Sequence, residues 1–189
     1  MGLLAPIPPE LLHVDKVIKS ARKRIKLLFR IRPFISPHVA LTIYQSMIKP
    51  ILLYCSPVLT TLSHTANNKI ESLQRRCGKY IGHNLNLSSI LCERKRSVAV
   101  KVFKAINSIG PDSLFASDFE FIDHNHGTRS NKSLLRLPRV KTEHGRKRFS
   151  FQGSIIFNQL DTASRTERSL IRFRRMVKSF EFDTSPQLN

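Results

Sequence analysis

The amino-acid sequence predicts an all-α protein: a small helical bundle, a long loop and a C-terminal pair of helices. Apolar residues recur at steps of three and four along most of the chain, which is the period of an amphipathic helix. Proline, glycine and serine stand where these periodic stretches begin and end. Hydrophobic residues make up 41% of the 189 residues, which is enough to bury a core.

The same pattern divides the chain into consecutive parts. A proline-containing, extended leader over residues 1–9 precedes a helical domain over 10–109. A polar connection follows over 110–145, where the period is lost and polar, proline and glycine residues dominate. The helical pair is expected over 146–182, with a tail over 183–189.

The first helix is expected over residues 10–31, because Pro33 disfavours a helical conformation at Arg32. One side of this helix is apolar and would face a core. Its residues are Leu11, Val14, Ile18, Ala21, Ile25 and Leu28. A second side is basic and would face solvent or an anion. Its residues are Lys16, Lys19, Lys23, Lys26 and Arg30.

The second helix is expected to begin at Ser36, a good N-cap, with Pro37 in the first helical position. Two apolar stripes cover more than half of its circumference, so we expect it in the centre of the core. Pro50 would kink this helix and Pro57 would end it. Its apolar excess also allows a protein partner that covers residues 39–54.

Two further helices are expected in the first domain. The third covers residues 66–81, with Thr65 as its cap and four cations pointing outward. These cations are Lys69, Arg75, Arg76 and Lys79. The fourth covers 89–108 and is closed by Gly110 and Pro111. Its basic residues Arg94, Lys101 and Lys104 are expected on the side away from its apolar stripe.

The C-terminal pair consists of a helix near residues 149–160 and one near 166–182. Phe149 and Phe151 also fit the alternation of a strand, but the wider spacing favours a helix. Three cations precede these rings, which would suit bases stacked on phenylalanine; the alternative is a helix start with both rings in the core. The cations are Arg146, Lys147 and Arg148. Arg172, Arg174 and Arg175 on the last helix have the same two interpretations.

Charge is the strongest compositional signal. The net charge is +19, from 32 Lys and Arg against 13 Asp and Glu. Residues 1–32, 33–110 and 111–189 are all cationic, at +6, +8 and +5. Such a chain favours a polyanionic partner, with nucleic acid first and an anionic membrane second.

Other function classes have little support. Cys55, Cys77 and Cys92 are an odd number at wide spacing, which indicates a reducing compartment and a nuclear or cytoplasmic location inside the cell. We see neither a signal peptide nor a membrane span. Only His124 and His126 form a close pair of metal-ligating residues, so the sequence predicts no metal site and no cofactor.

Several blocks of the chain resemble one protein family. The run LLFRIRPFISPHVALTIYQSMIKPILLYCSPV, followed by KIESLQRRCGKYI, resembles the thumb of reverse transcriptases from non-LTR (LINE-type) retrotransposons. Three later blocks are similar to the C-terminal region of that family. They are ERKRSVAVKVFKAINSIGPDSL, GTRSNKSLLRLPRVKTEHGRKRFSFQGSIIFNQL and SLIRFRRMVKSF. The blocks keep their order from residue 11 to residue 180.

This resemblance implies a fragment that binds template RNA, DNA or an RNA/DNA hybrid through basic helix faces. It implies no catalysis by this chain, because the adjacent aspartates that hold the metal ions of the polymerase are absent from its sequence. Two alternatives stay open: a degenerate transposon remnant without selected activity, and a basic helical module that binds a protein.

Overall fold

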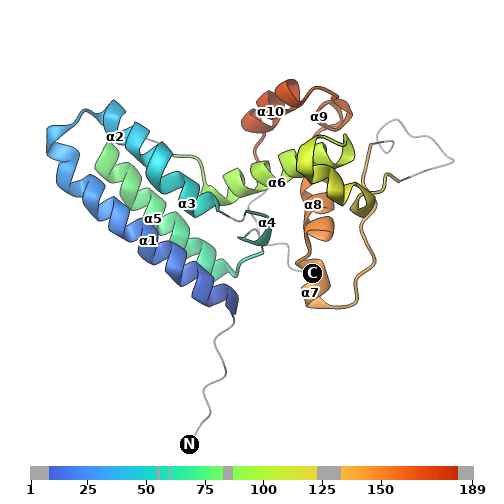
Figure 1. Cartoon of the computed structure of the whole chain (residues 1–189), viewed down its shortest axis with the longest axis horizontal. Helices are drawn as coiled ribbons and strands as arrows, with labels where there is room; N and C mark the ends of the chain where they lie inside the picture. The colour runs from blue at the N-terminus through green and yellow to red at the C-terminus, as the bar shows by residue number, and fades with distance from the viewer. Residues whose placement is uncertain (1–8, 55, 60, 83–86, 123–132, 183–189) are drawn as a thin grey trace, which may run out of the picture. The chain divides into compact units, whose positions relative to one another are not determined.

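The computed structural model describes residues 9–54, 56–59, 61–82, 87–122 and 133–182 (Figure 1). The predicted all-α class is confirmed. Among the described residues no strand forms, and the one β-type pairing is an isolated antiparallel bridge between Phe121 and Leu135.

The chain divides into two compact units. The N-terminal unit contains residues up to 54 together with 62–91, and the C-terminal unit contains 55–61 together with 92 onwards. The predicted helical domain over 10–109 therefore belongs to two units. One of the boundaries along the chain falls within α6 (Ile90–Ile106), where the apolar period continues without a break and gives no sign of a division.

Helix α1 (Pro9–Ile31) forms almost as its period predicts. Val14, Ile18, Ala21, Ile25 and Leu28 are all buried, and Val17 joins them. The side chain of Leu11 lies outside the described part of the chain. A short 3-10 turn (Arg32–Phe34) follows directly, with Pro33 inside it.

The second predicted helix is a chain of three helical pieces. They are α2 (Pro37–Ile43), a π turn (Tyr44–Ile48) and α3 (Lys49–Leu53). The start is as expected, since Oγ of Ser36 accepts a hydrogen bond from the Val39 N–H at 3.3 Å. The end differs from the prediction, because α3 stops at Leu53 and Pro57 lies inside the next short helix, α4 (Ser56–Leu59).

The π turn explains the two apolar stripes of this segment. Ala40, Tyr44, Ile48 and Leu52 are buried at intervals of four residues. In a regular α-helix of about 3.6 residues per turn, each such interval would overshoot a full turn, and the residues would drift off the core. The wider turn absorbs this drift, so one stripe faces the core before it and the other after it. It also makes room for Pro50, whose ring would clash with a carbonyl one turn earlier.

Helix α5 (His64–Ile81) begins two residues earlier than predicted. Its N-cap is Ser63 and not Thr65: Ser63 is extended, and its Oγ accepts from the Ala66 N–H at 3.3 Å. Serine and threonine are both suitable N-caps. Because the helix begins at His64, the residue just before it, Ser63, is the cap. Ile70, Leu73 and Cys77 are buried as expected.

Helices α1 and α5 lie side by side and run in the same direction (Figure 1). Arg32, just after α1, holds their C-terminal ends together. Its Nε donates to the carbonyl oxygen of Tyr80 at 3.0 Å, and its Nη2 donates to that of Ile81 at 3.0 Å. A cation is well placed there, because the last carbonyl groups of a helix lack partners within the helix.

The C-terminal unit has its own core. Val98, Val102 and Phe103 of α6 pack with residues of α8 (Phe149–Asn158) and α10 (Leu170–Ser179). The rings of Phe103 and Phe173 stack with their centroids 4.2 Å apart. The helix chosen for residues near 149 is therefore confirmed, as is the inward face of the last helix, where Phe173 and Val177 are buried.

The outward position that the sequence predicts for Arg94 is wrong. It was expected to point outward, but it is completely buried at 0% exposure. The reason is its spacing: Arg94 stands four residues before Val98, and residues four apart share one face of a helix. Lys101 and Lys104 do reach the surface side, where Nζ of Lys104 lies 3.5 Å from a carboxylate oxygen of Asp112.

The connection over 110–145 is more structured than its composition suggests. It contains a 3-10 helix (Gly110–Asp118) and α7 (Glu143–Arg146), and it contributes Phe119 and Leu135 to the core. Isolated apolar residues of this kind leave no periodic signal in a sequence. The predicted C-terminal pair also contains a third helix, α9 (Thr162–Thr166), which Asp161 caps.

Candidate nucleic-acid interface

The first candidate surface is the basic face of α1, formed by Lys16, Lys19, Lys23, Lys26 and Arg30. All of these residues are exposed. At 100° per residue they lie on the side of the helix opposite Val14, Ala21 and Ile25, which face the core. The face runs from Lys16 to Arg30, and these 14 steps at about 1.5 Å each make it roughly 21 Å long.

These side chains are available to an external anion. Among the described residues, no carboxylate lies within ion-pair distance of any cation on the α1 basic face. The exposed Asp15 is the nearest acidic residue along α1. Cations on a solvated surface normally have acidic neighbours at helical spacing. Their scarcity here leaves a field that attracts polyanions.

Helix α5 adds Arg75, Arg76 and Lys79, all exposed. Arg76 stands four residues before Tyr80, so both point to the same flank of α5. The ring of Tyr80 meets the ring of Phe29 on α1, with the centroids 4.8 Å apart and the planes tilted by 54°. Phe29 stands three residues after Lys26, so the contact joins the flank of α5 that carries Arg76 to the edge of α1 beside Lys26.

Phe29 gives this junction a chemical character that the sequence did not suggest. Its side chain is 56% exposed, although Tyr80 covers part of it. Aromatic rings beside cations are typical of surfaces that bind unpaired bases, because any base can stack on a ring. No period singles out Phe29, since it lies on neither the apolar nor the basic stripe of α1.

Arg146, Lys147 and Arg148 belong to the C-terminal unit, where Arg146 ends α7 and the other two lead into α8. Arg146 and Arg148 are exposed, whereas Lys147 is half-buried and its Nζ lies 3.5 Å from Glu143 Oε1. The Phe149 ring packs edge-on against the rings of Phe115 and Phe119, at centroid distances of 5.7 and 5.4 Å. It therefore serves the core, and the structure favours the interpretation of this segment as a helix start.

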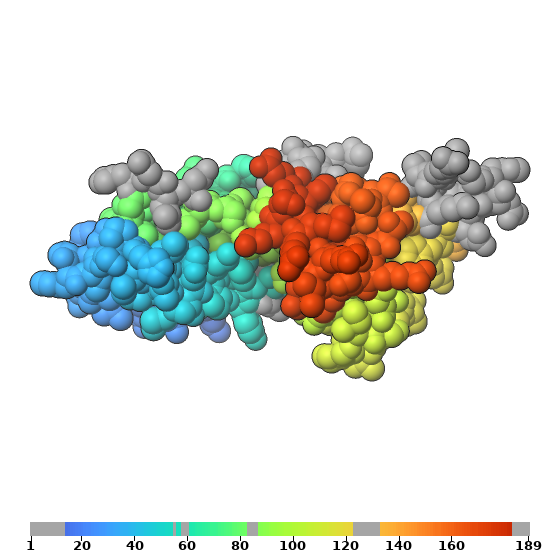
Figure 2. Space-filling model, turned by 90° about the horizontal axis from the view of Figure 1, so that it is seen from above, coloured from blue at the N-terminus to red at the C-terminus, as the bar shows by residue number. Residues whose placement is uncertain are grey.

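A third group of cations lies on α10. Arg172, Arg174 and Arg175 are exposed, on the solvent side of a helix whose other side buries Phe173 and Val177. The outer face of α10 is open in the space-filling view, where it is red (Figure 2). The α10 cations and the α1 basic face belong to different units of the chain.

The described residues offer little support for a metal site, a reactive thiol or a membrane-spanning helix. No three His, Cys, Asp or Glu side chains gather there as a metal site would require, and His124 and His126 lie outside that part of the chain. Burial raises the pKa of the Cys77 thiol to about 12, which makes it a poor nucleophile. No helix in the described ranges combines the length and apolar character needed to cross a bilayer.

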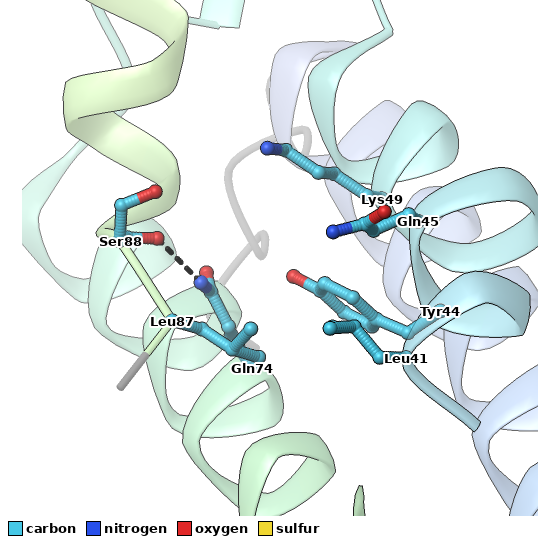
Figure 3. Close-up of a pocket in the computed structure, with 7 residues that line it drawn as sticks. All are labelled: Leu41, Tyr44, Gln45, Lys49, Gln74, Leu87 and Ser88. Atoms are coloured by element: carbon cyan, nitrogen blue, oxygen red, sulfur yellow. Dashed lines mark hydrogen bonds between the residues drawn. The ribbon is translucent and has the colours of Figure 1, made fainter. Parts of the chain in front are cut away.

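The structure also shows a pocket that the sequence did not reveal. It has a volume of about 310 Å³ and lies within the N-terminal unit, between the α2–α3 segment and α5 (Figure 3). Its walls consist of Leu41, Tyr44, Gln45, Lys49, Gln74, Leu87 and Ser88. These residues come from three separate stretches of the chain, so no local motif marks them.

Comparison of the chain with protein-family models, with curated proteins and with solved structures finds no significant match. The charge and geometry of the surfaces described above are therefore the basis for a functional proposal.

Proposed function

We propose that this protein binds nucleic acid through the N-terminal unit, with the α1 basic face as the main contact. The observation that carries the proposal is that the cations of this face lie opposite the core, exposed and without a carboxylate partner in the described structure. A phosphate backbone is the polyanion that fits a cationic strip of this length.

The α5 cations and the Phe29–Tyr80 contact extend this surface beyond one helix. Arg76 brings positive charge to the same side of the α1–α5 pair, and the exposed part of Phe29 offers an apolar surface to bases. The resemblance of residues 27–58 and 69–81 to a reverse-transcriptase thumb supports RNA or an RNA/DNA hybrid as the preferred form. Binding without catalysis is the proposed role of the chain.

A protein-binding role has weaker support. Most of the apolar surface of residues 39–54 is used inside the N-terminal unit, because the π turn directs both stripes to the core. Val39, Met47 and Tyr54 are the large apolar residues of this segment that stay exposed, at 44%, 47% and 64%. Scattered apolar residues of this kind are common on protein surfaces.

The test is a mobility-shift titration with single-stranded RNA, duplex DNA and an RNA/DNA hybrid between 50 and 200 mM salt. If about six phosphates are contacted, log affinity falls with log salt at a slope of roughly −5. The variant Lys19→Glu, Lys23→Glu, Lys26→Glu should weaken binding more than tenfold and flatten the slope by about 2 to 3, or about 0.9 for each lost phosphate contact.

A charge-matched control separates a specific surface from net charge. Arg139, Lys141 and Lys178 are exposed cations of the C-terminal unit, and their replacement by Glu changes the net charge by the same amount. This control should keep most of the affinity. Equal losses in both triple variants, or binding that does not respond to salt, would contradict the proposal.

A further inference from the structure

The pocket in the N-terminal unit contains a buried hydrogen-bond acceptor without a partner. Gln74 is only 3% exposed, and its Nε2 donates to the Ser88 carbonyl oxygen at 2.6 Å. This bond fixes the orientation of the amide, whose Oε1 is buried in the wall of the pocket. Among the described residues, no donor reaches that Oε1. Buried acceptors are nearly always paired, so a site of this kind indicates that an external donor completes it.

The opposite wall offers complementary groups. Tyr44, Gln45 and Lys49 lie on the α2–α3 side, and the Tyr44 hydroxyl and Lys49 ammonium point across the gap toward Gln74 and Ser88 (Figure 3). Leu41 and Leu87 line the remainder. A matching ligand therefore has an N–H or O–H donor for Gln74, a negative group near Lys49 and an apolar surface between them.

A nucleotide has all three of these features. The edge of a base carries N–H groups that amide side chains recognise, its faces are apolar, and its phosphate is an anion. The volume of about 310 Å³ is at the lower end of ligand pockets, which suits one nucleotide better than a larger molecule.

We propose that this pocket holds a single unpaired nucleotide, with a base N–H donating to Gln74 Oε1 and the phosphate beside Lys49. The nucleotide is either free or the unpaired end of a strand. The strand-end form rests on the nucleic-acid binding proposed above, whereas the free form does not.

Two probes separate these sources. The first is AMP, titrated by calorimetry. The second is a single-stranded oligonucleotide with a terminal 2-aminopurine, whose fluorescence reports transfer of the base into a protein site. Gln74→Leu removes the acceptor at similar volume, and Gln45→Trp blocks the pocket from its exposed rim without altering the core. Gln152→Leu, the same substitution in α8 of the other unit, is the matched control.

The wild type and Gln152→Leu should bind at least one of the two probes. Gln74→Leu should weaken that binding about two- to tenfold, the range for one hydrogen bond. Gln45→Trp should abolish it, and because Gln45 is exposed this variant tests the pocket even if Gln74→Leu fails to fold. A response from both probes assigns free nucleotide as well as strand ends to the pocket, and a response from the oligonucleotide alone assigns strand ends.

Two results would overturn the proposal: no response from either probe, or equal responses from the wild type and Gln45→Trp. These are distinguishable from failure of the proposed function. If strands bind with the expected salt slope but the pocket variants bind the probes as well as the wild type does, only the pocket proposal is refuted. If AMP binds in a Gln45-sensitive way while strands do not bind, the pocket stands and the nucleic-acid function falls.

Discussion

Gly153 of α8 packs directly against Val102 of α6. A Cβ atom at residue 153 would lie 2.7 Å from Cγ2 of Val102 and 3.1 Å from Cε1 of Phe119. Both neighbours belong to the core of the C-terminal unit and have little room to move. The close approach of these two helices therefore depends on glycine.

Gly153→Ala should destabilise the protein. Overpacking a core typically costs about 1 to 3 kcal/mol, and the better helix propensity of alanine returns part of it. We expect a net loss of about 1 to 2 kcal/mol in the free energy of unfolding, measured by urea denaturation. Gly82→Ala is the control, since a Cβ there meets nothing within 4 Å, and it should change stability by less than about 0.5 kcal/mol. Equal effects would refute the packing argument.

Arg32 and Arg30 should separate stability from binding. Arg32→Met removes the hydrogen bonds to the carbonyl oxygens of Tyr80 and Ile81 and should cost about 2 to 3 kcal/mol of unfolding free energy. Arg30→Met changes an exposed residue and should leave stability within about 0.5 kcal/mol while weakening nucleic-acid binding. Thermal denaturation and a mobility shift on both variants provide the measurements, and a reversed pattern would contradict these roles.

Asn158 should be important for the segment that crosses residues 133–136. Its Oδ1 accepts from the Leu135 N–H at 2.8 Å, and its Nδ2 donates to the Leu135 carbonyl oxygen at 2.9 Å. Asn158→Ala leaves two backbone groups of a buried residue unpaired, and we expect a loss of about 2 to 3 kcal/mol. Asn107→Ala, which removes a single bond to Phe103 at an exposed site, should cost less than half as much in the same urea titration.

Cys77 should make stability fall at alkaline pH. Burial raises the pKa of its thiol from 9.0 to about 12. Above pH 9 the unfolded chain loses this proton while the folded chain keeps it, so rising pH favours unfolding until about pH 12. The contribution is complete below pH 9 and is lost across that window. The unfolding free energy of the wild type should fall relative to that of Cys77→Val as the pH rises from 9 to about 12. A difference between the two proteins that does not change with pH would refute the assignment.

Much of the fold follows from local patterns. The burial of Val14, Ala21 and Leu28 was predictable because the period of α1 is regular over many turns. Ser36 and Pro37 marked the start of α2 because a cap and a first-turn proline act within a few residues. The basic face of α1 was predictable for the same reason, since exposure on one side of a helix follows from burial on the other.

The remaining features depend on contacts between distant segments. Phe119 and Leu135 enter the core from a stretch without a period, and Asn158 fixes Leu135 from a helix well separated along the chain. The pocket around Gln74 is assembled in the same way. Arg94 differs from these residues, because its four-residue spacing to Val98 does indicate burial. Its charge indicates the opposite, since arginine is rarely fully buried, and the charge proved the poorer guide.

The π turn at residues 44–48 fixes the length of its segment as well as its direction. Ala40 lies before the turn and Tyr44 is its first residue, whereas Ile48 is its last residue and Leu52 lies after it. All four side chains are buried in the same core. Deletion of one residue here would rotate the helix that follows by about 100°. Ile48 would leave the core, and a neighbouring residue that normally faces solvent would take its place. Substitutions at single positions disturb far less. Over evolutionary time this stretch should therefore accept changes of residue and reject changes of length.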